Sequence, residues 1–66
     1  MADRNIKQWK LVIKLHMAGL TYAEVGKLAG ITRQRAAQII NQARFYMNTH
    51  DDELADFIRL QMVGES

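Results

Sequence analysis

The stretch 19–46, GLTYAEVGKLAGITRQRAAQIINQARFY, constrains the fold of this chain more than any other part of it. It contains two short helical patterns, one on each side of Gly30. Thr21 and Thr32 precede these patterns at the positions where a side-chain oxygen caps the first turn of a helix. Glycine suits the left-handed backbone conformation that ends many helices, so Gly30 is expected to form a tight turn. The sequence therefore predicts two helices that meet at this turn.

The first helix of the pair is expected to run from Thr21 to about residue 29. Thr21 and Glu24 have the spacing of a capping box, in which each side chain bonds the backbone N–H of the other residue. Gly26 falls where the two helices should cross most closely, so a small residue is expected there. The second helix is expected over about 33–47, with one apolar side given by the 3.6-residue period. That side carries Ala36, Ile39, Ile40, Ala43, Tyr46 and Met47.

The other side of the second helix is polar in a way that favours contact with DNA bases. Asn and Gln match the adenine edge in the major groove, Arg matches guanine, and an Ala methyl can pack on a thymine methyl. Between Arg33 and Met47 the sequence contains no acidic residue, although exposed helices usually carry Glu. A merely solvated surface is the alternative interpretation. We expect base contacts from Arg33, Gln34, Ala37, Gln38 and Asn41.

Phosphate contacts are expected around the same two helices. Hydroxyl groups, basic side chains and the N-terminal amides of helices are the usual protein partners of DNA phosphates. The candidates are Thr21, Tyr22, Lys27, Thr32, Arg35 and Arg44. Charge along the whole chain agrees with a polyanionic partner: residues 1–47 carry a net charge of +6 and residues 48–66 a net charge of −4.

Two further helices are expected outside this stretch. One covers about 5–18 and buries Trp9, and the other covers about 51–63, with Thr49 and Asp52 as its capping box. Both carry more apolar residues than one packing surface needs, and a short chain without Cys gains stability readily from association. We therefore expect a homodimer. The candidates for packing or dimer contacts are Leu11, Leu15, Phe45, Leu54, Phe57, Ile58, Leu60 and Met62.

These patterns predict an all-α fold: one domain, 1–66, of about four helices. No apolar run is long enough to span a membrane, and the N-terminal residues do not have the form of a signal peptide. A soluble cytoplasmic protein that associates with the nucleoid is the expectation.

Nothing in the sequence favours catalysis. Cys is absent, Ser66 is the only serine, and no nucleophile has a base at a useful spacing. His50, Asp51 and Asp52 could be imagined as a metal site, but helix capping explains these carboxylates more simply. We expect no enzyme activity, no cofactor, no metal and no small-molecule ligand.

On the residues from Gly19 to about Ala43, the chain resembles the helix-turn-helix of small phage and plasmid repressors of the Cro/CI kind. The segment ITRQRAAQI is also similar to the recognition helix of the promoter-reading domain of bacterial sigma factors. The resemblance depends on Val25, Gly26, Gly30, Ile31 and Ile39. Two residues depart from the usual pattern: Gly26 stands where Ala is more common, and Ala36 stands where a larger aliphatic residue is more common.

The resemblance implies a sequence-specific transcriptional regulator that binds double-stranded DNA. A homodimeric repressor would place its two recognition helices about 34 Å apart on an inverted repeat. The alternative is an adaptor that uses the helix-turn-helix as a scaffold and binds RNA polymerase or another regulator through its acidic C-terminal helix.

Overall fold

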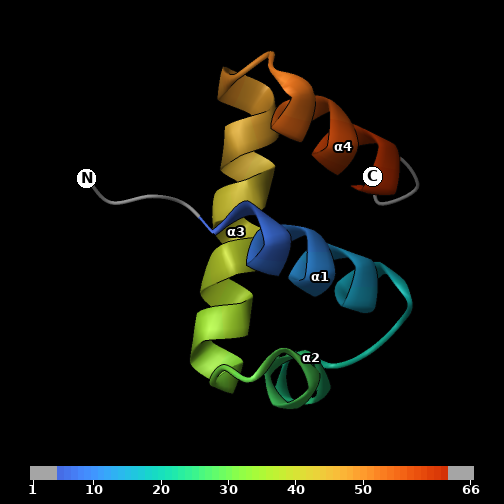
Figure 1. Cartoon of the computed structure of the whole chain (residues 1–66), viewed down its shortest axis with the longest axis vertical. Coiled ribbons are helices and arrows are strands. Elements are labelled where there is room, and N and C mark those ends of the chain that lie inside the picture. Colours follow the sequence, from blue (N-terminus) through green and yellow to red (C-terminus); the bar gives the residue numbers. More distant parts are fainter. Residues whose placement is uncertain (1–4, 63–66) are drawn as a thin grey trace.

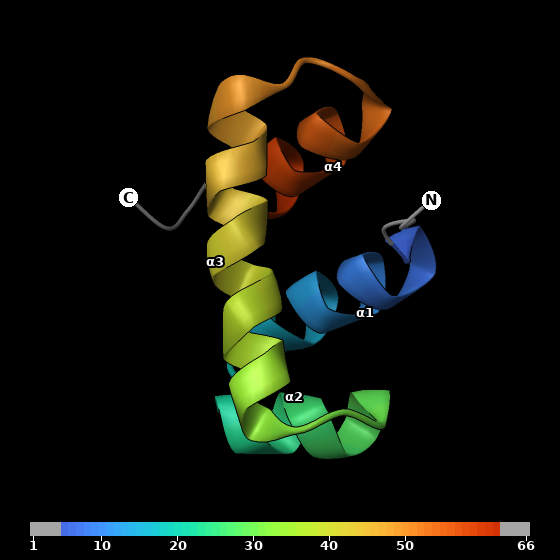
Figure 2. The same ribbon diagram turned by 90° about the vertical axis from the view of Figure 1, so that its left-hand side faces the viewer.

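The structure, a computed structural model, describes residues 5–62, and this range contains four helices and no strand. They are α1 (Ile6–Met17), α2 (Tyr22–Ala29), α3 (Arg33–Thr49) and α4 (Glu53–Met62). The expected small all-α bundle is therefore confirmed. The long helix α3 runs the length of the molecule, with α2 at the end where α3 begins (Figure 1). Seen from the side, α1 and α4 lie on the same side of α3 (Figure 2).

Helix α3 is the common packing partner of the bundle, because α1, α2 and α4 all contact it. Helix α1 also contacts α2 and α4, whereas α2 and α4 do not contact each other. The expected apolar side of α3 is confirmed, since five of its six residues are buried and Met47 is half-buried. The buried core consists of Trp9, Val12, Ile13, Val25, Ala36, Ile39, Ile40, Ala43, Tyr46, Leu54, Ala55, Ile58 and Met62.

The turn between α2 and α3 is formed as the sequence predicts. The Thr21 hydroxyl oxygen accepts from the Glu24 amide at 3.2 Å, and the Thr21 amide donates to the Glu24 carboxylate at 2.9 Å, which completes the capping box. Gly30 ends α2 with a φ of 76°, in the left-handed region. Thr32 then caps α3, because its hydroxyl oxygen accepts from the Arg35 amide at 3.0 Å. These contacts fix the direction in which α3 leaves the turn.

Gly26 lies against the backbone of this turn. A Cβ atom at Gly26 would lie 2.8 Å from the Ile31 carbonyl oxygen and 2.9 Å from the Thr32 carbonyl oxygen. Both contacts are too short for a real Cβ, and the opposing atoms are backbone atoms with little freedom to move. The expectation of a small residue is confirmed, and the structure explains why glycine replaces the more common alanine: α2 and the turn are too close for a methyl group.

The C-terminal end of α3 differs from the expectation. The helix continues to Thr49, two residues beyond the expected end, and Thr49 does not cap α4. Instead, the Thr49 hydroxyl donates to the Phe45 carbonyl at 3.0 Å, and the Asn48 side-chain amide donates to the Arg44 carbonyl at 3.1 Å. The prediction of a Thr49 cap was wrong because the side chains of both residues bond to α3 itself.

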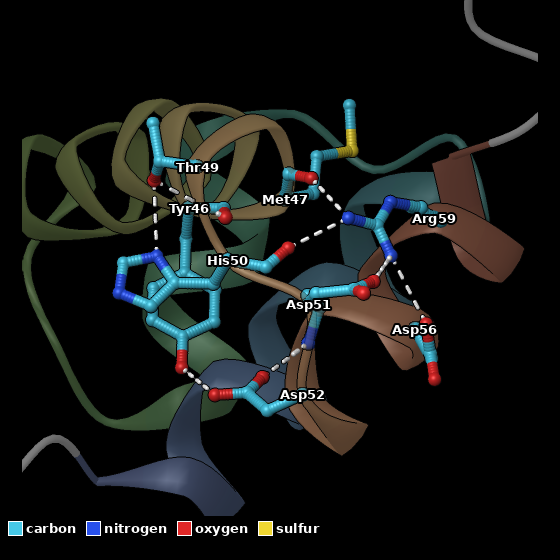
Figure 3. Close-up of polar contacts among 9 residues, drawn as sticks. Tyr46, Met47, Thr49, His50, Asp51, Asp52, Asp56 and Arg59 are labelled. Atoms are coloured by element: carbon cyan, nitrogen blue, oxygen red, sulfur yellow. Dashed lines mark hydrogen bonds and ion pairs between the residues drawn. The ribbon is translucent and has the colours of Figure 1, made fainter.

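Asp52 caps α4 instead, and it also ties this helix to α3. Its Oδ1 atom accepts from the Ala55 amide at 3.0 Å, and its Oδ2 atom accepts from the Tyr46 hydroxyl at 2.5 Å (Figure 3). The pKa of the Asp52 carboxyl is lowered, chiefly by the Tyr46 hydroxyl and then by the Ala55 amide, while His50 adds a smaller effect in the same direction. The His50 ring stacks on the Tyr46 ring at a centroid distance of 3.8 Å.

Arg59 of α4 binds backbone carbonyls at the C-terminal end of α3. Its Nη2 atom donates to the carbonyl oxygens of Met47 at 2.8 Å and His50 at 2.6 Å (Figure 3). These carbonyls lie at the helix C-terminus, where intrahelical donors run out. The Nη1 atom pairs with Asp56 at 3.0 Å and with Asp51 at 3.4 Å. Helix α4 is thereby fixed to the end of α3 by polar contacts as well as by its apolar side.

Two further expectations concern the limits of the fold. The C-terminal helix was expected to include Val63, which lies outside the described residues, and the described part of α4 ends at Met62. Within residues 5–62, no helix has the length and apolar character needed to cross a membrane.

Candidate nucleic-acid interface

The five predicted base-contacting residues all lie on one side of α3, away from the core. They form two rows of single-turn steps over the first nine residues of the helix, Arg33–Ala37–Asn41 and Gln34–Gln38–Asn41. Ala36, Ile39 and Ile40 on the opposite side are fully buried, so the rotation of α3 about its axis is fixed. Of the five, Ala37 is half-buried, and the exposed residues are Arg33, Gln34, Gln38 and Asn41.

Gln38 already uses one hydrogen-bonding group within the helix. The Arg35 guanidinium donates to its Oε1 atom at 3.2 Å. Recognition of adenine requires both the oxygen and the amino group of a glutamine side chain. Gln38 would therefore exchange Arg35 for the base, and the released Arg35 guanidinium would be available for a nearby phosphate.

The predicted phosphate contacts fall into two groups. Thr21, Lys27, Thr32 and Arg35 are exposed, whereas Tyr22 and Arg44 are half-buried. Because the Thr32 oxygen accepts from the Arg35 amide, the Thr32 hydroxyl hydrogen can still donate to a phosphate. The Thr21 hydroxyl also contacts the Glu24 carboxylate at 3.3 Å, which makes Thr21 the less suitable donor.

Tyr22 has a fixed place at the start of α2. Its ring stacks on the His16 ring at a centroid distance of 5.5 Å with an angle of 20° between the planes. The stacking joins the end of α1 to the start of α2 and leaves Tyr22 half-buried. A tyrosine hydroxyl held in this way can donate to a phosphate without losing much side-chain entropy on binding.

Charge is distributed unevenly between the two ends of α3. Helix α3 contains three arginines and no acidic residue. In the described range, four of the five acidic residues lie within 51–56, at the opposite end of α3 from the turn. Helix α3 has 17 residues and is about 25 Å long, so the acidic segment 51–56 is far from its first turn. The first turn is consequently the more favourable end for a polyanion.

The predicted packing and dimer residues divide by location. Leu54, Ile58 and Met62 lie in the core of the chain itself, and Leu15 and Phe57 are partly buried against that core. The remaining three are exposed on the described surface: Leu11 at 42%, Phe45 at 69% and Leu60 at 74%. Most of the apolar surplus of α4 is thus used within the chain, and only three of the eight candidates are free for a partner.

Sequence reasoning did not single out Arg59, which fixes α4 to α3 through the carbonyls of Met47 and His50. Its one available signal was its position as the only Lys or Arg after residue 47, in an acidic segment. Asp52, singled out with Thr49 as a capping pair, caps α4 alone.

No group of three or more His, Cys, Asp or Glu residues in the described part of the chain is arranged to hold a metal ion. His50 and Asp52, considered above as candidate ligands, are joined through Tyr46 as part of the α3–α4 corner. Comparison of the chain with protein-family models, curated proteins and solved structures gives no match.

Proposed function

We propose that this protein is a sequence-specific transcriptional regulator that inserts α3 into the major groove of double-stranded DNA. The observation that carries the proposal is the exposed side of α3, where Gln34, Gln38 and Asn41 follow one another at single-turn spacing. Amide side chains at this spacing can reach base edges about two base pairs apart in the groove. The caps at Thr21 and Thr32 and the left-handed Gly30 set the direction of α3 and keep this side of the helix outward.

The surroundings of α3 support a polyanionic ligand. A DNA-binding helix needs cations beside the groove and no carboxylate facing the phosphates. Helix α3 meets both requirements, and Lys27 and Thr32 add an ammonium and a hydroxyl near its first turn. A protein with this role is expected in the cytoplasm, associated with the nucleoid.

The proposal includes a homodimer that represses transcription by occupying a promoter. Leu11 lies one turn from Lys7 and from Lys14 on α1, and Leu60 lies one turn after Asp56 on α4. The Leu11 surface is apolar and basic. Beside Leu60, Asp56 is paired with Arg59 but its side chain is still 67% exposed, so a lysine of the partner can also contact it. A twofold axis would form this contact twice, once in each direction. Leu11 and Leu60 lie on α1 and α4, which both pack on α3, so a dimer formed through them would leave the exposed amides of α3 open to DNA.

Selection of bound duplexes from a random DNA pool tests this proposal. A homodimer with one recognition helix per subunit should enrich an inverted repeat whose half-sites are centred about 34 Å apart. Enrichment of a single half-site would support DNA recognition without the dimer. Selection that returns no preferred sequence would contradict the proposed function.

An adaptor that binds RNA polymerase or another regulator is the second candidate. It is favoured by the exposed side of α4, where Leu60 is 74% exposed beside Asp56. Replacement of Gln34 and Gln38 by Ala separates the two functions, because an adaptor does not need these amides. A double variant that keeps full regulatory activity in cells would favour the adaptor.

A further inference from the structure

Phe45 is exposed on the side of α3 that carries the proposed base contacts. It follows Asn41 by four residues and Gln38 by seven, so the three side chains project from the same side of the helix. Phe45 is 69% exposed, whereas the other aromatic residues of the described range are buried or half-buried. The row of amide side chains on α3 therefore ends in an uncovered aromatic ring.

Helix α4 does not cover this ring, although the sequence suggested that it could. It packs on the opposite side of α3, where the Tyr46 hydroxyl reaches Asp52 and the Met47 carbonyl accepts from Arg59. Because α3 continues to Thr49, Phe45 lies within a regular helix and not at a loose end. The regular helix keeps the Phe45 ring in line with the amides, and α4 leaves the ring uncovered.

We propose that Phe45 contributes to sequence specificity by packing on the 5-methyl group of a thymine. This inference rests on the proposed DNA-binding function. Four residues of helix rise by about 6 Å, which corresponds to roughly two base pairs at about 3.4 Å each. The thymine would lie about two base pairs beyond the base contacted by Asn41, on the side away from Gln34. A thymine methyl is the apolar group of the major groove, and phenylalanine is suited to it.

Charge favours DNA over a second copy of the chain as the partner of this ring. A second α3 packed over Phe45 would approach Asn41 and Asn48, one turn away on either side, and would leave their amides in an apolar contact. It would also bring together two helices that each carry three arginines and no carboxylate. DNA phosphates beside the groove neutralise these same arginines.

The test replaces thymines of the selected DNA site with uracil, one at a time, and measures the affinity of each duplex by fluorescence anisotropy. Uracil lacks only the 5-methyl group. Wild-type protein should lose about three- to tenfold in affinity at one thymine of each half-site. The Asn41→Ala variant locates the base that Asn41 contacts, because discrimination between base pairs should be lost at that position. The sensitive thymine should lie about two base pairs further along.

Phe45→Ala should bind the thymine duplex more weakly by the same factor and show no further loss on the uracil duplex, whereas Phe45→Leu should keep part of the sensitivity. Leu28→Ala removes an apolar side chain of similar exposure from α2 and should behave as wild type. Circular dichroism shows whether each variant folds.

Three results would overturn the inference. If wild-type protein binds DNA but no single thymine methyl affects its affinity, Phe45 does not read thymine. If Phe45→Ala retains the uracil sensitivity, another residue contacts the methyl. If Phe45→Ala changes the protein from dimer to monomer in sedimentation, Phe45 is a subunit contact. Failure of wild-type protein to select any sequence would overturn the proposed function itself, and this inference with it.

Discussion

At the scale of single residues, Gly26 shows how a departure from a familiar pattern can be a structural requirement. The repressors that this stretch resembles usually have alanine at this position, and the sequence alone indicated only that a small residue was needed. The structure brings the Ile31 and Thr32 carbonyls so close that a Cβ would meet both. Glycine is required because the backbone of α2 lies so close to the backbone of the turn, and this distance cannot be read from the sequence.

Gly26→Ala is expected to destabilise the protein by about 1–3 kcal/mol, because α2 must move away from the turn to admit the methyl group. Urea denaturation followed by circular dichroism measures the change. Lys27→Ala is the matched control on the exposed side of the same helix and should stay within about 0.5 kcal/mol of wild type. Equal stability of Gly26→Ala and wild type would show that the turn yields easily.

The exposed amides of α3 lead to a prediction about affinity. Gln34→Ala and Gln38→Ala should each cost about 1–3 kcal/mol of binding to the selected DNA and should relax specificity at one base pair. Lys27→Ala should instead weaken binding to all sequences and lower the salt dependence by about one counterion. Titrations at several salt concentrations distinguish the two. Uniform weakening by every variant would mean that the amides contact only the backbone of DNA.

For the helices, the sequence predicted best those features that depend on residues close together in the chain. The apolar side of α3, the capping box of α2 and the turn at Gly30 depend on residues within a few positions of one another. The end of α3 could not be predicted in this way. Asn48 and Thr49 are weak helix formers that resemble caps, but Arg59, ten residues further on, binds the carbonyls at this end. The last turn of α3 is thus stabilised by a contact from another element as well as by the local bonds of Asn48 and Thr49.

Arg59→Ala should weaken the junction between α3 and α4. The loss of charged hydrogen bonds to two carbonyls should cost about 1–2 kcal/mol for this partly exposed side chain. Arg33→Ala is the control: it removes an arginine from the positive N-terminal end of α3, so stability should be unchanged or slightly raised. Thermal unfolding of both variants measures the difference. If the two variants are equally stable, the contacts of Arg59 contribute nothing to stability.

The stability contributed by Asp52 at the junction of α3 and α4 should depend on pH. The pKa of Asp52 is lowered from an ordinary value of 3.8, so its charge stabilises the folded state above that pH, and this stabilisation is lost as pH falls through the folded pKa. Asp52→Asn keeps a cap for α4 but has no charge. The unfolding free energy of wild type should therefore fall more steeply than that of the variant below about pH 4. Parallel profiles in urea denaturation would rule out this role of Asp52.

At the scale of the whole molecule, the sequence overestimated how much apolar surface is left for a partner. It left Leu54, Ile58 and Met62 open as packing or dimer contacts, because α4 has apolar residues on more than one side. In the structure these three residues face α1 and α3 and belong to the core. An apolar residue in a sequence can be buried within its own chain or against a partner chain. For these three side chains, the packing of α4 on α1 and α3 shows that they are buried within the chain.

Leu11 and Leu60 remain as the surface on which the proposed dimer depends. Sedimentation equilibrium at micromolar concentrations should show a dimer for wild type. Leu11→Ala and Leu60→Ala should each weaken it by about tenfold or more, because the twofold axis repeats each change. Leu28→Ala, an exposed leucine outside both surfaces, is the control. A wild-type protein that is monomeric with and without its DNA site would exclude the dimer.

Helix α2 has the fewest buried residues of the four helices. It buries only Val25 and Gly26 of its eight residues, whereas α4, which also packs on two helices, buries Leu54, Ala55, Ile58 and Met62. Helix α2 can therefore open locally while the other three helices remain packed, so its amide hydrogens should exchange with solvent before those in the middle of α3. DNA held across α2 and the first turn of α3 would slow this exchange. The segment that orients the candidate interface is thus expected to be the least protected helix in the free protein and to gain the most protection on binding.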